Sequence, residues 1–255
     1  MGDALIGGLL ASGLAPHQIR VAELDPARRK QLEEHRGVEC CDDAAAVVDA
    51  SDVVVLALKP NVVRPVLEGL AGSRAADPLW ISIAAGVTLA SLGDPLPAKA
   101  RIVRAMPNTP ALVGAGATAI CGNAAATSDD LSVARALFES VGSCWTAPNE
   151  GLIDAVTGLS GSGPAYVFVF LEALGDAGVR MGLPRDAAYQ LAFQTVYGAA
   201  KLAIEQGQHP AALKDQVTSP GGTTIAGVER LEAGGLRAAV HAAVQAATER
   251  SRELG

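Results

Sequence analysis

The chain has 255 residues, enough for one large or two modest domains, each with its own hydrophobic core. Hydrophobic residues make up 49% of it, charged residues only 18%, and 28 residues are glycine, which favours a buried sheet with closely packed helices and excludes a disordered chain. The net charge is −7 and the charges are scattered, so no basic surface for nucleic acid or an anionic membrane is predicted.

The cysteines and histidines show no metal-ligand spacing. Cys40 and Cys41 are adjacent, and Cys121 and Cys144 lie far from them in the sequence. We therefore expect neither a disulfide framework nor a metal site, and we expect a reducing, cytoplasmic compartment. No apolar run reaches the roughly 18 residues that a membrane-spanning helix needs. The first residues also lack the charged leader and cleavage site of a secretory signal.

Residues 1–149 alternate short β-branched segments with helical ones. The strand at 53–58 is apolar at every position, as expected of a strand covered on both faces. Further strands are predicted at 19–24, 79–84, 101–105 and 117–121, and helices at 26–35, 62–70 and 130–141. This alternation predicts an α/β dinucleotide-binding domain with a Rossmann-like, doubly wound parallel sheet.

Residues 150–255 carry only helical patterns, so an all-α second domain is predicted. The helix at 164–179 is apolar nearly all round, with Ser162 as its N-cap and Gly182 as its stop. The other helices are predicted at 184–206, at 211–217 and on either side of Gly234-Gly235. Because so short a domain cannot comfortably cover an apolar helix, we expect a partner subunit to pack against residues 164–179.

Three loops of the first domain follow predicted strands, and ligands of doubly wound sheets bind at the carboxyl ends of the strands. In the first, residues 58–61, Lys59 offers charge to a phosphate or ribose; an ordinary solvated loop is the alternative. In the second, residues 83–86, small side chains let a flat ligand approach the backbone, unless they serve only tight packing. The third loop, residues 105–110, is by itself only weak evidence for a binding site.

Two glycine-rich segments precede helices of the second domain. Residues 157–164 lead into the apolar helix, where a flexible connector is the alternative. Residues 218–224 place hydroxyls and two glycines before a helix, whose free N–H groups attract carboxylates and phosphates. A simple N-cap needs fewer such residues, so a binding site is favoured. Glu172 and Asp176 are spaced for acid–base work, but we interpret them as structural.

In these segments the chain resembles the pyrroline-5-carboxylate reductase family. Its signature is matched most closely by residues 213–225, LKDQVTSPGGTTI, and nearly as specifically by residues 153–166, IDAVTGLSGSGPAY. Residues 57–60, 84–88 and 104–110 match in the same order and spacing, so the resemblance covers the whole chain. It implies a homodimer, with dimers assembled into a larger ring, that reduces 1-pyrroline-5-carboxylate to L-proline, the last step of proline biosynthesis. The hydride would come from NADPH, with NADH as the other option.

The resemblance also implies site residues. The positions that would contact the cofactor are Gly2, Asp25, Ala57, Leu58, Lys59, Pro60, Ala84 and Ala85. At the adenosine ribose, the Asp25 carboxylate favours a free 2′-hydroxyl, whereas Arg28 and Arg29 favour a 2′-phosphate. The positions that would hold the substrate are Glu150, Ser219, Gly222, Thr223 and Thr224. Thr224 is the candidate catalytic residue, hydrogen-bonded to the ring nitrogen, and no metal is required.

One departure from the family lies at the start of the chain. Members begin with an apolar strand and a glycine loop, of which only Met1 and Gly2 match the last positions here. We therefore expect Met1 to be an internal methionine of a longer protein, whose preceding residues form an apolar run ending in Gly-x-Gly-x. Without that central strand two interior strands lose a neighbour, so this chain is expected to express poorly and bind NADPH weakly.

Two alternatives from other classes stay open. One is another dehydrogenase with a Rossmann and a helical domain, acting on an imine or a 3-hydroxy acid. That class would carry a catalytic lysine on the long helix, and residues 175–180 contain none. The other is an inactive truncated homologue, which cofactor titration would separate from an enzyme.

Overall fold

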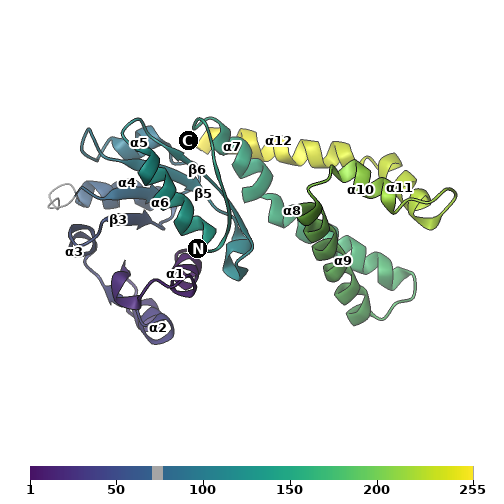
Figure 1. Cartoon of the computed structure of the whole chain (residues 1–255), viewed down its shortest axis with the longest axis horizontal. Coiled ribbons are helices and arrows are strands. Elements are labelled where there is room, and N and C mark those ends of the chain that lie inside the picture. Colours follow the sequence, from purple (N-terminus) through teal and green to yellow (C-terminus); the bar gives the residue numbers. More distant parts are fainter. Residues whose placement is uncertain (71–76, 255) are drawn as a thin grey trace. The chain divides into compact units, whose positions relative to one another are not determined.

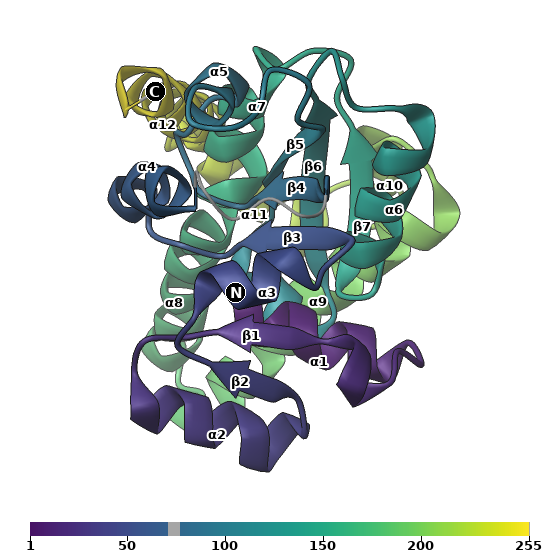
Figure 2. The same cartoon turned by 90° about the vertical axis from the view of Figure 1, so that its left-hand side faces the viewer.

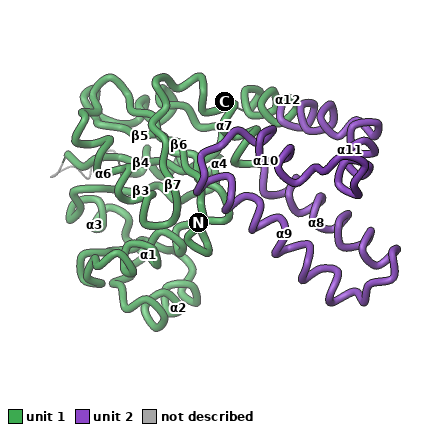
Figure 3. Tube along the Cα trace, turned by 45° about the vertical axis from the view of Figure 1, so that its right-hand side comes forward, with its two compact units in different colours: residues 1–162, 245–255 green, residues 163–244 purple. Residues whose placement is uncertain are grey.

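The computed structural model describes residues 1–70 and 77–254, which fall into two compact units (Figure 3). Unit 1 comprises Met1–Ser162 and Gln245–Gly255, and unit 2 comprises Gly163–Val244. These units are defined by which parts of the chain contact one another. The functional domains expected from the sequence, residues 1–149 and 150–255, have different bounds and remain a prediction.

Unit 1 alternates strands and helices along the chain (Figure 1). Its strands are β1 (Arg20–Ala22), β2 (Glu39–Cys41), β3 (Val53–Leu56), β4 (Leu79–Ser82), β5 (Ile102–Met106), β6 (Gly116–Gly122) and β7 (Gly142–Thr146). Its helices are α1 (Gly2–Ala11), α2 (Pro26–Arg36), α3 (Ala44–Asp49), α4 (Pro60–Gly69), α5 (Leu89–Gly93), α6 (Ser128–Glu139) and α7 (Leu152–Val156). The strands and helices predicted for this half are confirmed, whereas β2 and β7 were missed because neither has an apolar β-branched run.

The strands of unit 1 form two sheets, one of order β1-β2 and one of order β3-β4-β5-β6-β7. All neighbours pair in parallel except β5 and β6, which are antiparallel. Strand β6 departs from the predicted parallel arrangement because only a short 3₁₀ turn, Thr109–Val113, joins it to β5. A parallel neighbour would need a longer crossover connection.

Apolar clusters cover both faces of the larger sheet. On one face Val63 and Leu67 of α4 and Leu92 of α5 are fully buried against the strands. On the other face Leu5 of α1 and Phe138 of α6 are buried in the same way. Each such side chain contributes about 1.5–3 kcal/mol through burial. The sheet is therefore covered by helices on both faces, and the doubly wound α/β prediction is confirmed.

Unit 2 is entirely helical, as predicted. It contains α8 (Gly163–Arg180), α9 (Arg185–Gln206), α10 (Pro210–Gln216), α11 (Thr223–Ala233) and the first part of α12 (Leu236–Leu254). Helices α8 and α9 pack closely, since a Cβ on Gly175 would lie 2.9 Å from the Tyr189 ring. Asp176 of α8 also forms an ion pair with Arg185 of α9 at 2.7 Å. This contact supports the interpretation that Asp176 has a structural role.

Helix α8 is not buried within a single chain, which agrees with the expectation that residues 164–179 are too apolar for this short domain to cover. Phe168 is 62% exposed and Val169 is 67% exposed, and Gly175 is the helix's one buried residue. The sequence pattern identified an apolar helix correctly, but its cover does not come from this chain. Over the described residues, no helix combines the length and the apolar character needed to cross a bilayer.

Candidate cofactor and substrate sites

The predicted cofactor loops leave the larger sheet at one edge. Strands β3, β4 and β5 are parallel neighbours, with Leu56 opposite Ser82 and Ser82 opposite Arg104, so their carboxyl ends lie side by side. The Ile83 amide also donates to the Leu56 carbonyl at 3.3 Å. Six of the predicted cofactor positions therefore fall in two adjacent loops: Ala57, Leu58, Lys59, Pro60, Ala84 and Ala85. Their contact with a cofactor remains a prediction.

The start of α1 lies against the first of these loops. A Cβ on Gly2 would come 3.3 Å from the Cβ of Ala57, so the predicted Gly2 position joins the same group. Helix α1 has Met1 as its N-cap and no side-chain capping hydrogen bond. Its first N–H groups are therefore available at the positive end of the helix dipole, an arrangement that favours a phosphate.

The third loop after a strand packs on the glycine-rich segment that precedes α8. The buried Asn108 side chain donates to the Ser160 carbonyl at 3.1 Å and accepts from the Ala117 amide at 2.8 Å. Residues Thr157–Gly161 form a π-helical turn rather than a flexible connector. Gly161 packs closely against the third loop, since a Cβ there would lie 2.6 Å from the Met106 methyl group and would force that side chain to shift. π-turns are frequent at functional sites.

Asp25 and its neighbouring arginines have separate tasks. Asp25 caps α2 by accepting from the Ala27 amide at 2.9 Å. The Arg29 guanidinium donates to the carbonyls of Glu23, at 2.7 Å, and Leu24. Both side chains thus shape the loop after β1, and Arg28 alone of the three extends into a pocket.

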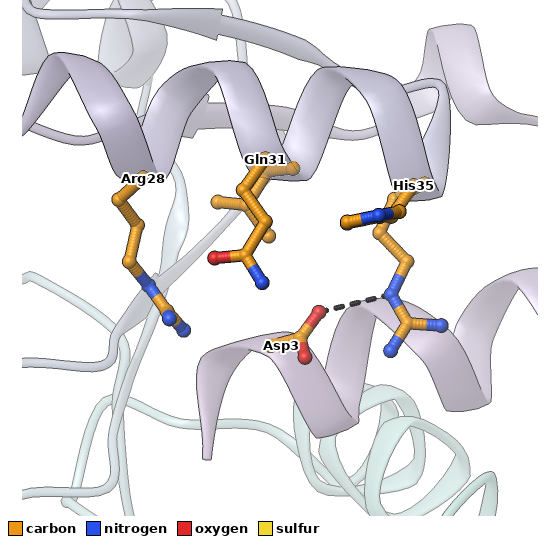
Figure 4. A pocket seen from close by; sticks show the side chains of 6 residues that line it. Asp3, Arg28, Gln31 and His35 are labelled. Atoms are coloured by element: carbon orange, nitrogen blue, oxygen red, sulfur yellow. Dashed lines mark hydrogen bonds and ion pairs between the residues drawn. The ribbon is translucent and has the colours of Figure 1, made fainter.

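This pocket, of about 330 Å³, lies between α2 and the first turn of α1 (Figure 4). Arg28, Gln31 and His35 reach from α2 toward Asp3. The Arg36 guanidinium donates to the Asp3 carboxylate at 2.9 Å, and this hydrogen bond lowers the pKa of Asp3. Gln31 and His35 were not predicted from the sequence, although their spacing from Arg28 places all three on one helix face.

The predicted substrate residues of unit 2 share one turn, formed by Ser219, Gly222, Thr223 and Thr224. The Gly222 amide donates to the Ser219 carbonyl at 3.1 Å, and a side chain at Gly222 would clash with the Ser219 hydroxyl. Gly222 is the N-cap of α11 and offers no side-chain cap, while both threonines are exposed. Exposed hydroxyls beside uncapped helix amides can bind a carboxylate. Such binding remains a prediction.

Glu150 belongs to unit 1, where it is part of an ion-pair network. Its Oε1 accepts from Arg104 Nη1 at 2.8 Å and from the Leu89 amide at 2.7 Å, at the start of α5. Arg104 is 3% exposed and also lies 3.6 Å from Asp154, whose carboxylate accepts from the Ser251 hydroxyl at 2.8 Å. The one signal for this network in the sequence is an arginine within the otherwise apolar strand β5. A substrate role for Glu150 remains a prediction.

The Cys144 thiol should react slowly with alkylating reagents. Burial raises its pKa to about 11, from an ordinary value of 9.0. The thiolate is the reactive form, so at pH 8 we expect iodoacetamide to modify Cys144 about 100-fold more slowly than an unperturbed thiol. Peptide mass spectrometry measures the rate, with the same thiol in urea as the control. Equal rates in the folded and the urea-unfolded protein would contradict the expectation.

Two family models match separate parts of the chain. The one described as "Pyrroline-5-carboxylate reductase dimerisation" matches residues 150–254. The one described as "NADP oxidoreductase coenzyme F420-dependent" matches residues 1–86. The first therefore covers the helical part and the second covers the loops after β3 and β4.

Relatives match over the full length. The chain is 51% identical to the pyrroline-5-carboxylate reductase of Synechocystis sp., with 100% of this chain and 95% of the relative aligned. It is 45% identical to that of Escherichia coli, with 100% and 94% aligned.

Solved structures show the same similarity. The Coxiella burnetii pyrroline-5-carboxylate reductase has a TM-score of 0.95 at 38% identity, and the NADP-bound Plasmodium falciparum pyrroline carboxylate reductase has 0.88 at 31%. Both alignments cover 100% of this chain and 94% of the other.

Proposed function

The chain belongs to the pyrroline-5-carboxylate reductase family, and we propose that it reduces 1-pyrroline-5-carboxylate to L-proline with NADPH. The observation that carries this proposal is the full-length similarity to reductases of this one name, at 45–51% identity in two relatives. The loops at the sheet edge and the turn before α11 supply the two kinds of binding group that the reaction needs.

The cofactor fits the sheet edge of unit 1. The uncapped amides of α1 beside Ala57 suit a pyrophosphate, and Ala84 and Ala85 let a flat ring approach the backbone. When bound, NADPH supplies the hydride. Arg28 in the pocket beside α1 would favour the 2′-phosphate, whereas Asp25 is engaged as a helix cap. The NADP-bound relative supports the same preference.

The substrate is a cyclic imine that carries a carboxylate. We assign its carboxylate to the first amides of α11 and to the hydroxyls of Ser219 and Thr223, where the helix dipole favours negative charge. The Thr224 hydroxyl would hydrogen-bond the ring nitrogen. Protonation of that nitrogen makes the adjacent carbon electrophilic, so the residues of this turn mainly orient the ring and stabilise its charge.

The reaction is tested by following NADPH oxidation with pyrroline-5-carboxylate as substrate. The assay should use this chain and a version that carries an added N-terminal strand and glycine loop. Proline formation coupled to NADPH oxidation in either version supports the proposal. Cofactor binding without oxidation of NADPH in both versions would instead favour an inactive homologue.

The four free cysteines favour a reducing compartment, so we place the reaction in the cytoplasm.

The match to a reductase dimerisation model supports a homo-oligomer, and we assign α8 to the interface between subunits. Phe168→Glu should convert the assembled protein into monomers at micromolar concentration, because a charge buried in an apolar interface costs several kcal/mol. Light scattering measures the mass. Val133→Glu is the control, since Val133 is 45% exposed on α6 of unit 1.

An assembled Phe168→Glu variant, or a monomeric parent protein, would remove α8 from the interface. The same measurement addresses the larger ring of dimers, which stays a proposal. A parent mass well above that of a dimer is the expected result if dimers assemble further.

A further inference from the structure

The last turn of α12 belongs to unit 1, where it packs on the loop between β4 and α5. This β4–α5 loop, residues 83–88, contains the predicted cofactor positions Ala84 and Ala85. A Cβ on Gly86 would lie 3.3 Å from the Cβ of Leu254, and in Figure 2 the yellow end of α12, marked C, lies beside α5 and α7. Gly86 has a φ of +76°, so a residue with a side chain would be strained there as well as crowded. The loop therefore meets the helix through its backbone.

The far end of the β4–α5 loop is held by Glu150. The Glu150 Oε1 accepts from the backbone N–H of Leu89, the first residue of α5, at 2.7 Å. The same oxygen accepts from Arg104 Nη1 at 2.8 Å, so the guanidinium sets the position of the carboxylate. Because α5 has only five residues, the course of the loop depends on where Glu150 holds this first amide.

Arg104 is shared between two carboxylates. It is 3% exposed, and its guanidinium lies 2.8 Å from Glu150 and 3.6 Å from Asp154 of α7. One cation does not compensate two carboxylates in so buried a place, so the more distant carboxylate needs a further donor. Ser251 of α12 is buried, and its hydroxyl donates to Asp154 Oδ1 at 2.8 Å. The last turn of α12 thus completes the ion-pair network next to the loop.

We propose that Ser251 is a positioning residue for NADPH, acting through the ion pairs beside the β4–α5 loop. While its hydroxyl satisfies Asp154, Arg104 stays bonded to Glu150. Without the hydroxyl, Asp154 competes with Glu150 for the guanidinium, and Glu150 holds the Leu89 amide less firmly. The loop then loses the fixed backbone course that a flat ring needs for close approach. This inference rests on the proposed function, which assigns the loop to the cofactor.

Ser251→Ala tests this role in the full chain, and Ser132→Ala is the matched control. Ser132 is exposed on α6, and its hydroxyl donates within its own helix, to the Ser128 carbonyl at 2.9 Å. Both variants place alanine, a good helix former, inside a helix. In Ser251→Ala, hydrogen–deuterium exchange of the Leu89 amide should be about tenfold faster or more. The Kd of NADPH, from fluorescence titration, should rise about tenfold. Ser132→Ala should change neither quantity, and Ser251→Thr, which keeps the hydroxyl, should restore both.

Four results would overturn the proposal. They are unchanged exchange at Leu89 in Ser251→Ala, faster exchange with an unchanged Kd of NADPH, equal effects in Ser132→Ala, and no rescue by Ser251→Thr. The second of these would leave the hydrogen bond a purely structural role, visible as a lower urea midpoint alone. Failure of the proposed reaction has a different signature: the parent chain binds NADPH without oxidising it, while Ser251→Ala still raises the Kd. A parent chain that does not bind NADPH, with or without an added N-terminal strand, would overturn both.

Discussion

Thr224→Ala should lower turnover of pyrroline-5-carboxylate about 100-fold while the affinity for NADPH changes little. Loss of one hydrogen bond that strengthens in the transition state typically costs on the order of 10²-fold in rate. Thr224 lies in the first turn of α11, exposed and beside uncapped amides, where its hydroxyl is available to a substrate nitrogen. Steady-state kinetics and NADPH titration measure the two effects separately.

The hydroxyl and the methyl group of Thr224 are distinguished by Thr224→Ser, which should keep most of the turnover. Thr223→Ala is the matched comparison one position earlier, and we expect it mainly to raise KM because Thr223 is assigned to the substrate carboxylate. Unchanged turnover in Thr224→Ala would remove this residue from the mechanism. An equal loss of turnover in Thr224→Ser would show that the methyl group of Thr224, and not its hydroxyl, causes the effect.

The elements that could be predicted from the sequence are those whose patterns are local. The apolar run at Val53–Leu56 and the helical pattern at 184–206 are each set by their own segment, and both predictions are confirmed. Strand β2, with the sequence Glu-Cys-Cys, forms because β1 beside it supplies the pairing. The antiparallel direction of β6 likewise depends on how the Thr109–Val113 turn packs, which periodicity does not describe.

The candidate site divides in the same way. The turn at 218–224 and the loops after β3 and β4 were recognisable because glycines and hydroxyls are adjacent in sequence. The pocket between α1 and α2 was not, since Asp3 and Arg36 meet across 33 positions. The Arg104 network was also missed, because Asp154 and Ser251 are 97 positions apart. Only tertiary structure brings such polar partners together.

Glu150→Gln should destabilise the protein by about 2 kcal/mol, measured as a fall in the urea midpoint. Arg104 is almost completely buried, and removing the charge of its closest partner leaves the guanidinium poorly compensated. Glu150 itself is 29% exposed, so solvent screening keeps the cost below the largest values for buried pairs. The glutamine side chain is also a weaker hydrogen-bond acceptor than the carboxylate for the backbone N–H of Leu89 at the start of α5.

Glu68→Gln is the matched control, because Glu68 accepts from Arg64 at a similar distance, 2.9 Å, on an exposed helix face. Its expected cost is about 0.5 kcal/mol or less. Kinetics then separate two roles for Glu150. A purely structural role leaves the KM for pyrroline-5-carboxylate unchanged in the folded Glu150→Gln enzyme, whereas contact with substrate raises it.

Arg104→Met is a further variant that separates the structural role from the substrate role. It removes the same ion pair from the other side, so it should lower the urea midpoint as well. If only Glu150→Gln raises KM, Glu150 contacts the substrate directly. If neither variant lowers the urea midpoint, the ion pairs of Arg104 with Glu150 and Asp154 do not stabilise the protein.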